Sequence, residues 1–560
     1  MRVTNKIIQN NSVNNINLNK TLQDKLNTQM ATEKKINRPS EDPVVAIRAL
    51  RLRTNVSQVT QYYSKNIPDA NSWLELTEDA LGTTTDVLTD MIESVSKGVS
   101  EKLTDQDRKS ILDALSAYKD EVYSTGNADY AGRSLFTGYR TESTLMYEAS
   151  ETRKMQITEQ LTVASIDTIT YVNSGFLNGL NSSNYGTGTY ETGTYDFASR
   201  TVTTNSNNNS DIAEQEISES SIKRIRLAYD NLEDSRRITV KLFNKTSTAD
   251  KISDRYGGSA DTLLEPVNMS RDAVPSPYQV ISDANAAGKD FMVLIPETGE
   301  LLISDSVYNK LAALNDDITS PTVNEAEFRI TYEKSTWDKG DLRPEHYFAC
   351  KDMSKDDPAT TEDESIIYNS SYLEGIREKQ AIEYDVGTSQ TVRVNTTADE
   401  VFTHAIGRDT EDLINVLNET IAMQETINRL TDTQKAIDTT DVNYTANYNT
   451  LQSQIDAANK ALTYLEEKRV NMFKQGITRM QNHLNKANTA TTACGTRGSK
   501  LALVENRLMS QKTNFETLES ENENVDISEV AIQLKSAMLT YDAALMSTSK
   551  VLQTSLMNYI

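Results

Sequence analysis

The sequence predicts a mainly α-helical protein with a β-rich insert, in which long antiparallel N- and C-terminal helical rods carry a central β-rich outer region. Three observations predict this fold class. Apolar residues recur every three or four positions along both ends of the 560-residue chain, which is the spacing of a one-sided helix. Glycine and proline, with 21 and 10 residues, are too scarce to interrupt many helices. Only in the middle of the chain does the apolar period fall toward two, as in strands.

The N-terminal region divides at a short break. Residues 1–42 carry few apolar side chains among many Asn and Gln, so we expect an inner-core segment that is disordered in the monomer and helical only when copies assemble. Asp42 can cap the next helix, with Pro43 at its first position, where the missing N–H costs nothing. Residues 43–140 are then predicted to form the N-terminal rod helices, with a kink or local irregularity at Pro68.

Residues 141–400 are predicted to form a β-rich variable outer region of one or two modules, because Thr, Ser, Asn, Gly and Tyr become frequent there. Two apolar runs on either side of Glu297–Glu300 predict a hairpin. Ser221–Tyr229 is either a short helix or a strand, and Asn205–Asn209 is a polar tract without the apolar side chains for a core. Further strands, or loop and edge segments, are predicted at Phe328–Tyr332, Thr391–Val394 and Tyr185–Tyr195.

The C-terminal region mirrors the N-terminal one. We expect rod helices over 401–494, an interruption near Cys494–Gly498, and an inner-core helix over 495–560. Each one-sided helix lacks a partner close in sequence, so the economical fold packs the N- and C-terminal rods on each other. The chain between them is then an excursion from the tip of a helical hairpin.

Apolar stripes near both chain ends mark candidate contacts between subunits. The last stripe reaches a chain end, where a monomer has little to bury it against. Residues 1–53 carry ten Lys and Arg against four Asp and Glu, which fits either a solvated helix face or complementary packing between subunits. The predicted assembly residues are Leu52, Val56, Val59, Tyr63, Leu74, Leu81, Leu534, Met538, Tyr541, Leu545, Leu552, Leu556 and Tyr559.

Composition and motifs argue against several other functions. A net charge of −24 disfavours nucleic-acid binding, and no apolar stretch approaches the length of a membrane span. The N-terminus lacks the apolar core of a secretory signal peptide. Two cysteines make neither a disulfide framework nor a zinc site, and no phosphate-binding loop or hydrolase motif occurs, so we expect no enzyme, cofactor or metal. The weak candidates, each more simply explained as core or solvated loop, are Gly186–Gly188, the pair His346 and Cys350, His404, His483, and the acidic run Asp356–Glu364 as a calcium site.

Ordered motifs at both ends resemble the flagellin family. Ile36–Pro43 is similar to the INRPSDDP signature of that family, with Glu41 in place of the commoner Asp. The start, Met1–Asn5, and the end, Ser555–Ile560, resemble the hook-associated branch of the family rather than flagellin itself. The resemblance covers 1–140 and 410–560, and its other motifs are Gln61–Leu74, Glu78–Leu81, Gly132–Tyr139, Gly340–Phe348, Ile382–Gly387, Val394–Thr397, Gly495–Arg497 and Val525–Glu529.

This resemblance implies a structural component of the bacterial flagellum at the hook–filament junction, where it joins the hook-associated ring to the flagellin filament. It implies four partners, namely other copies of the chain in a ring, hook-associated protein 1, flagellin and a flagellar export chaperone, with neither nucleic acid nor membrane. It also implies an extracellular location on the flagellum, reached by type III export without a cleaved signal peptide. The alternatives are flagellin, the filament subunit, and an enzyme within the insert, which the missing catalytic motifs disfavour.

Overall fold

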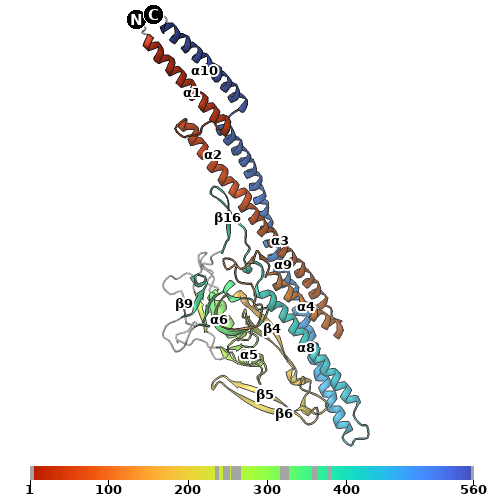
Figure 1. Ribbon diagram of the computed structural model, residues 1–560. Coiled ribbons are helices and arrows are strands. Elements are labelled where there is room, and N and C mark those ends of the chain that lie inside the picture. Colours follow the sequence, from red (N-terminus) through yellow and green to blue (C-terminus); the bar gives the residue numbers. More distant parts are fainter. Residues whose placement is uncertain are drawn as a thin grey trace. The chain divides into compact units, whose positions relative to one another are not determined.

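The computed structural model describes residues 5–233, 239–243, 252–253, 266–315, 327–355, 364–374 and 380–556. The chain forms two compact units. Unit 1 comprises Met1–Ser72, Glu383–Arg393 and Thr496–Ile560, and unit 2 comprises Trp73–Ile382 and Val394–Gly495. Helices occupy both ends of the described chain and strands occur between them, so the predicted helical N-terminal region with a β-rich part is confirmed (Figure 1).

The helices begin where the local sequence caps them. The Asp42 carboxylate accepts hydrogen bonds from the N–H groups of Val44 and Val45, and Pro43 occupies the first turn, as the sequence predicts. The described helices are α1 (Asn5–Thr32), α2 (Pro43–Gln61), α3 (Ile67–Gly98), α4 (Asp105–Thr125), α5 (Pro277–Ala286), α6 (Asp305–Asn315), α7 (Ala398–Val401), α8 (His404–Lys435), α9 (Tyr444–Glu523) and α10 (Ile527–Leu556).

An irregular turn precedes Pro68, and it confirms the predicted irregularity. Tyr62–Asn66 form a π-helical turn, in which the N–H of Ile67 donates to the carbonyl of Tyr62. Pro68 has no N–H to donate, so one carbonyl in the preceding turn loses its usual partner. The wider π-helical turn is a common response to such an interruption.

One predicted interruption is wrong. The sequence suggests a break near Cys494–Gly498, but α9 continues through it without interruption. A helical glycine costs only about 1 kcal/mol relative to alanine, and Cys494 and Leu501 on this helix are both buried, which offsets that cost. The helix ends instead before Asn524–Asp526, and the Asp526 carboxylate accepts hydrogen bonds from N–H groups in the first turn of α10.

The predicted strand segments are confirmed. Ser221–Tyr229 begins as a strand, and the hairpin turns at Gly299, whose φ of 66° suits glycine. The strands are β1 (Asp129–Tyr130), β2 (Arg133–Ser134), β3 (Glu151–Leu161), β4 (Ile166–Asn173), β5 (Thr189–Asp196), β6 (Thr201–Asn208), β7 (Ser218–Arg226), β8 (Thr239–Phe243), β9 (Ile252–Ser253), β10 (Val267–Asn268), β11 (Met292–Ile295), β12 (Glu300–Ile303), β13 (Glu327–Trp337), β14 (Ala349–Asp352), β15 (Ile366–Tyr368), β16 (Glu383–Gly387) and β17 (Gln390–Arg393).

Two main sheets form within unit 2. One has five strands in the order β10-β11-β12-β7-β4, and only its β10–β11 pair is parallel. The other has six strands in the order β15-β14-β3-β13-β8-β9, and every described pair in it is antiparallel. Smaller two-stranded sheets pair β1 with β2, β5 with β6 and β16 with β17.

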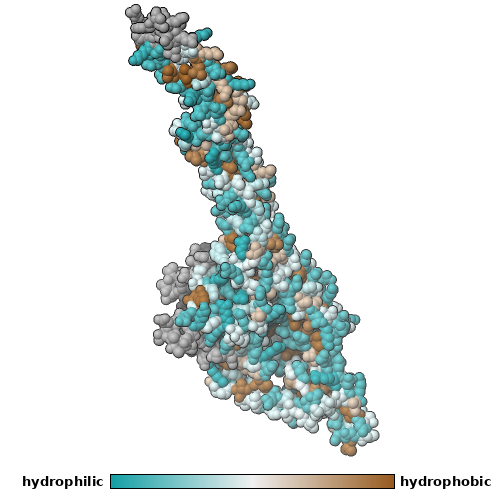
Figure 2. All heavy atoms as spheres, in the orientation of Figure 1, coloured by the Kyte–Doolittle hydropathy of each residue, from teal (hydrophilic) through white to brown (hydrophobic). Residues whose placement is uncertain are grey.

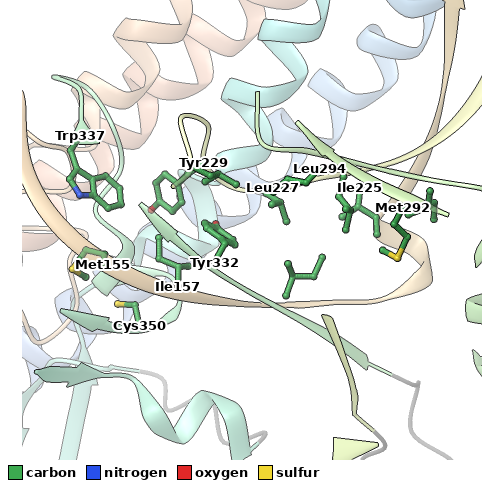
Figure 3. Packing of buried hydrophobic residues seen from close by; sticks show 14 of the residues in the cluster. Met155, Ile157, Ile225, Leu227, Tyr229, Met292, Leu294, Tyr332, Trp337 and Cys350 are labelled. Carbon is green, nitrogen blue, oxygen red and sulfur yellow. The ribbon is translucent and has the colours of Figure 1, made fainter. Parts of the chain in front are cut away.

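The two main sheets bury their side chains in one shared core (Figure 3). Trp337 on β13 stacks on Tyr147 with ring centroids 5.0 Å apart. Burying a large apolar side chain stabilises a fold by about 1.5–3 kcal/mol, so this cluster is a major source of the stability of unit 2. Residues that the two sheets and adjacent segments contribute to it include Met155, Ile157, Ile225, Leu227, Tyr229, Met292, Leu294, Tyr332 and Cys350.

Helices also pack closely within unit 2, at the C-terminal end of α3. A Cβ atom on Gly98 would overlap the ring of Phe473, which is fully buried. Gly82, on the same helix, has open space where its Cβ would lie. Gly98 is therefore needed for close packing, whereas Gly82 is not.

Candidate assembly surface

Helices α1 and α10 lie side by side in unit 1 (Figure 1). Leu26 on α1 is buried in a cluster with Val530, Leu534 and Ala537 on α10. The side-chain amide of Gln23 donates to the backbone carbonyl of Ala537 at 3.1 Å. These contacts identify the face that each helix presents to the other.

The face of α1 that meets α10 is mostly polar. Its least exposed residues recur every three or four positions, but only Ile16 and Leu26 among them are apolar. Paired helices usually bury apolar residues at such positions, so α1 contributes little apolar surface to this contact. The residues of this face are Gln9, Ser12, Ile16, Asn19, Gln23, Leu26 and Gln29.

Many apolar side chains of the same two helices are exposed instead. Ile532, Leu539 and Met546 lie seven residues apart on α10 and are 70%, 70% and 72% exposed. We call these three residues the outer face of α10. Figure 2 shows apolar residues at the surface of the terminal helices. The other exposed large apolar residues on α1 and α10 are Ile7, Ile8, Val13, Leu18, Leu22, Met30, Ile527, Met538 and Leu545.

Helix α2 carries a further exposed stripe. Val44, Ile47 and Leu50 are spaced three residues apart, and Arg48 and Arg51 flank them. Scattered exposed apolar residues are normal, whereas aligned ones form a surface of the kind that a partner can bury. Unit 1 therefore presents apolar stripes on at least two helices.

In unit 1, a buried carboxylate links the segment between α1 and α2 to the segment between α9 and α10. Glu523, at the end of α9, is 5% exposed, and Arg53 donates to both of its oxygens, with Nε 2.6 Å from Oε1. Lys34 Nζ lies 3.2 Å from Oε2 of the same carboxylate. Backbone hydrogen bonds join the same segments, from Lys35 N–H to Glu523 O and from Val525 N–H to Glu33 O. We call this arrangement the Glu523 joint.

The predicted assembly residues fall in different environments. Leu74 and Leu81 are buried in unit 2, and Val59 and Leu534 are buried in unit 1. Half-buried residues are Leu52, Val56, Tyr63 and Tyr541, and the exposed ones are Met538 and Leu545. Leu552 and Leu556 fall in the last turns of α10, and Tyr559 lies outside the described residues. Their role in assembly stays a prediction, as does disorder of residues 1–42 in the monomer.

Unit 2 contains a buried cluster of charged groups that the sequence did not predict. The Arg224 guanidinium on β7 contacts Asp167, Glu300 and Asp412, with Nη2 2.6 Å from Asp412 Oδ2. Burial alone would raise the pKa of the Asp412 carboxyl, but Arg224 and Arg226 hold it below its ordinary value. The cluster joins the five-stranded sheet to α8.

Among the weak chemical candidates, His346, Cys350 and His483 are buried, His404 is half-buried, and Gly186–Gly188 lie at an exposed or half-buried turn. Burial lowers the pKa of His346 to about 4 and raises that of the Cys350 thiol, so neither is poised for nucleophilic chemistry. His404 packs edge-on against Tyr229, and His483 Nε2 lies 2.8 Å from Asp409. Residues 356–363 of the acidic run lie outside the described residues.

In the described part of the chain, no three His, Cys, Asp or Glu side chains gather as a metal site would require. No helix in the described ranges combines the length and apolar content needed to cross a bilayer.

Comparisons with known proteins agree with the motifs. Residues 3–141 match the family model described as bacterial flagellin N-terminal helical region. Flagellar hook-associated protein 3 of Salmonella typhimurium is 26% identical over 187 residues, which are 33% of this chain and 59% of that protein. The protein of the same name from Escherichia coli is 30% identical over 120 residues, 21% of this chain and 38% of that protein.

Residues 3–141 are thus similar to the N-terminal helical region of bacterial flagellin. The chain is also similar to flagellar hook-associated protein 3, so the resemblance found in the motifs is confirmed. It spans 59% and 38% of the lengths of those curated relatives. Among solved structures, FlgL of Xanthomonas campestris aligns with 82% of this chain and 98% of its own, at 13% identity and a TM-score of 0.23, which is too low to compare the helix arrangement.

Proposed function

We propose that this chain is a structural subunit of the bacterial flagellum that acts at the hook–filament junction and joins the hook-associated ring to the flagellin filament. The observation that carries the proposal is the distribution of apolar residues on α1 and α10: a contact to which α1 contributes mostly polar side chains, and many apolar residues of both helices outside it. A monomer gains nothing from that distribution, whereas neighbouring subunits would bury the exposed stripes. The similarity to hook-associated protein 3 supports the location.

In this proposal the N- and C-terminal helices form an antiparallel rod, which is the part that builds the wall of the assembly. Contacts within unit 1 support this: Leu26 meets Val530 and Leu534, and Gln23, nearer the N-terminus, meets Ala537, farther along the chain. The β-rich part of unit 2 forms the outer region. Copies of the chain form a ring, with hook-associated protein 1 on one side and flagellin on the other.

The exposed stripe of α10 also has a role in export. The chain leaves the cell through the flagellar type III channel without a cleaved signal peptide, and an export chaperone covers the exposed stripe of α10 beforehand. A chaperone at that stripe would prevent aggregation through the apolar residues that later meet other subunits.

Replacing Leu539 by Asp tests the proposal. Burying one leucine contributes about 1.5–3 kcal/mol, and this contribution recurs at each subunit contact, so the variant should be folded and exported but should not support a filament. Val442→Asp is the matched control, because Val442 is 98% exposed in unit 2. The expected result is flagellin in the medium for Leu539→Asp and normal filaments for the control.

Immunogold labelling of the native chain locates it on the flagellum. A single band at the hook–filament boundary is expected. Label along the whole filament would favour the flagellin alternative and contradict the junction role. Normal filaments with Leu539→Asp would contradict the role of the outer face, and a Leu539→Asp chain retained in the cell would assign that face to chaperone recognition.

A further inference from the structure

Unit 2 contains a large cleft that the proposed structural role does not use. Its volume is about 860 Å³, and it lies between β4, β5 and the start of α5 on one side and helices α8 and α9 on the other. Protein interiors are otherwise close-packed, and clefts of roughly 300–1,000 Å³ are the size of small-molecule sites. The cleft therefore has room for an organic ligand.

Aromatic rings line two parts of the cleft. Tyr171 and Tyr278 stack with centroids 5.2 Å apart, and Phe176 and Tyr190 stack with centroids 5.1 Å apart. The Thr298 hydroxyl, which also lines the cleft, is buried and has no hydrogen-bond partner among the described residues. The site thus offers flat apolar surface and an unused polar group.

The charged side chains that line the cleft are predominantly acidic. Arg224 is engaged by the buried carboxylates described above, and Lys468 lies 2.7 Å from Glu419. In the described part of the chain, no cation lies within ion-pair distance of Glu191, Glu216 or Asp272. The seven lining carboxylates are Glu191, Glu216, Asp272, Asp283, Glu300, Asp412 and Glu419, against the three cations Arg224, Arg271 and Lys468.

The carboxylates act on the hydroxyl groups of the cleft. Burial raises the pKa of Tyr190, and the negative charge of Glu216 raises it further. Burial likewise raises the pKa of Tyr171, and Glu419 and Asp283 add to that shift. Seven lining carboxylates against three cations therefore favour a cation over an anion in this space.

We propose that this cleft binds a small organic polycation, a chain of methylene groups that carries several protonated amines. The amines would pair with Glu216, Asp272 and Asp283, and the methylene groups would lie against the tyrosine rings. A neutral sugar would stack on the same rings but would leave the carboxylates without counter-charge. The inference stands apart from the junction role, because it uses no residue of the outer face.

Calorimetric titration of the full chain with spermidine tests this proposal. We expect saturable binding at one site, and binding at least fivefold weaker in the variant Glu216→Gln/Asp283→Asn. The control Asp86→Asn/Asp90→Asn removes the same charge from exposed positions on α3, outside the cleft, and should bind as the native chain does. Circular dichroism establishes that each variant is folded.

Three outcomes would overturn the proposal. Equal weakening in both variants would mean that spermidine responds only to the net charge of −24. The absence of saturable heat up to millimolar spermidine would mean that the cleft has no such ligand. Binding of maltotriose with the same affinity as spermidine would assign the cleft to neutral sugars instead. None of these results bears on the flagellar role, which the filament experiment tests separately.

Discussion

Replacing Glu523 by glutamine should loosen the Glu523 joint without changing its shape. The carboxylate accepts two hydrogen bonds from Arg53 and forms an ion pair with Lys34. Hydrogen bonds to charged groups contribute about 1.5–3 kcal/mol when buried. Because the Arg53 and Lys34 side chains are 56% and 41% exposed, water compensates part of the loss, and we expect a cost of about 1–2 kcal/mol.

Hydrogen exchange measures this change at two backbone groups. The N–H of Lys35 donates to Glu523 O and the N–H of Val525 donates to Glu33 O, so both become exchangeable only when the joint opens. A loss of about 1–2 kcal/mol should speed their exchange by roughly 5–30-fold. Amides in the core of unit 2 should be unaffected.

Glu516→Gln is the matched control for this experiment. Glu516 lies on the same helix, is 51% exposed and makes one ion pair with Lys512 at 3.8 Å. Such surface pairs contribute less than about 1 kcal/mol, so exchange at Lys35 and Val525 should not change. The reasoning fails if Glu523→Gln leaves both amides protected, or if the control speeds them equally.

Three other predictions concern stability. Hydrogen bonds from Arg53 lower the pKa of Glu523 below its ordinary value of 4.5. Protection of the joint amides, corrected for intrinsic exchange rates, should therefore be complete above pH 4.5 and should decline as the pH falls through the lower pKa of the folded state. The Glu523→Gln variant should show no such decline. Gly98→Ala should destabilise unit 2 by about 1–3 kcal/mol, whereas Gly82→Ala should stabilise it by about 0.5–1 kcal/mol. Tryptophan fluorescence during urea unfolding measures both changes, because both tryptophans are in unit 2. Equal effects of the two substitutions would contradict the close packing at Gly98. Asp412→Asn should cost about 1.5–3 kcal/mol by the same measurement, because Arg224 and Arg226 each lose a buried charge-assisted contact while Asp167, Glu300 and Glu411 still face them, and an unchanged midpoint would contradict the importance of the cluster.

Features with a local physical cause could be predicted from the sequence. Asp42 caps α2 because its carboxylate reaches N–H groups two and three residues away, and Pro68 disturbs its own helix because it lacks a donor. The hairpin around Gly299 has the same local character. The error near Cys494–Gly498 arose because glycine was taken as a stop signal, while the burial that sustains the helix there depends on distant residues.

Features that depend on long-range contacts could not be predicted. Arg224 meets Asp167 and Asp412, which are 57 and 188 residues away in the chain, and no spacing rule connects them. Glu523 meets Arg53 across 470 residues. Apolar residues recur every three or four positions in α10, but this spacing alone does not show which of several apolar stripes faces α1. Ala537 occupies a contact position against α1, whereas its larger neighbour Met538 is 44% exposed.

The mixed polar and apolar contact of α1 with α10 restricts how the two helices can slide along each other. A purely apolar contact would tolerate a slip of one heptad, about 10 Å, because leucine can replace leucine. Here a slip would break the hydrogen bond from Gln23 to Ala537 and would remove Leu26 from its cluster with Val530 and Leu534. These contacts favour one longitudinal offset of the two helices. Any neighbour that binds their exposed stripes would then meet the same pattern of apolar residues on every copy.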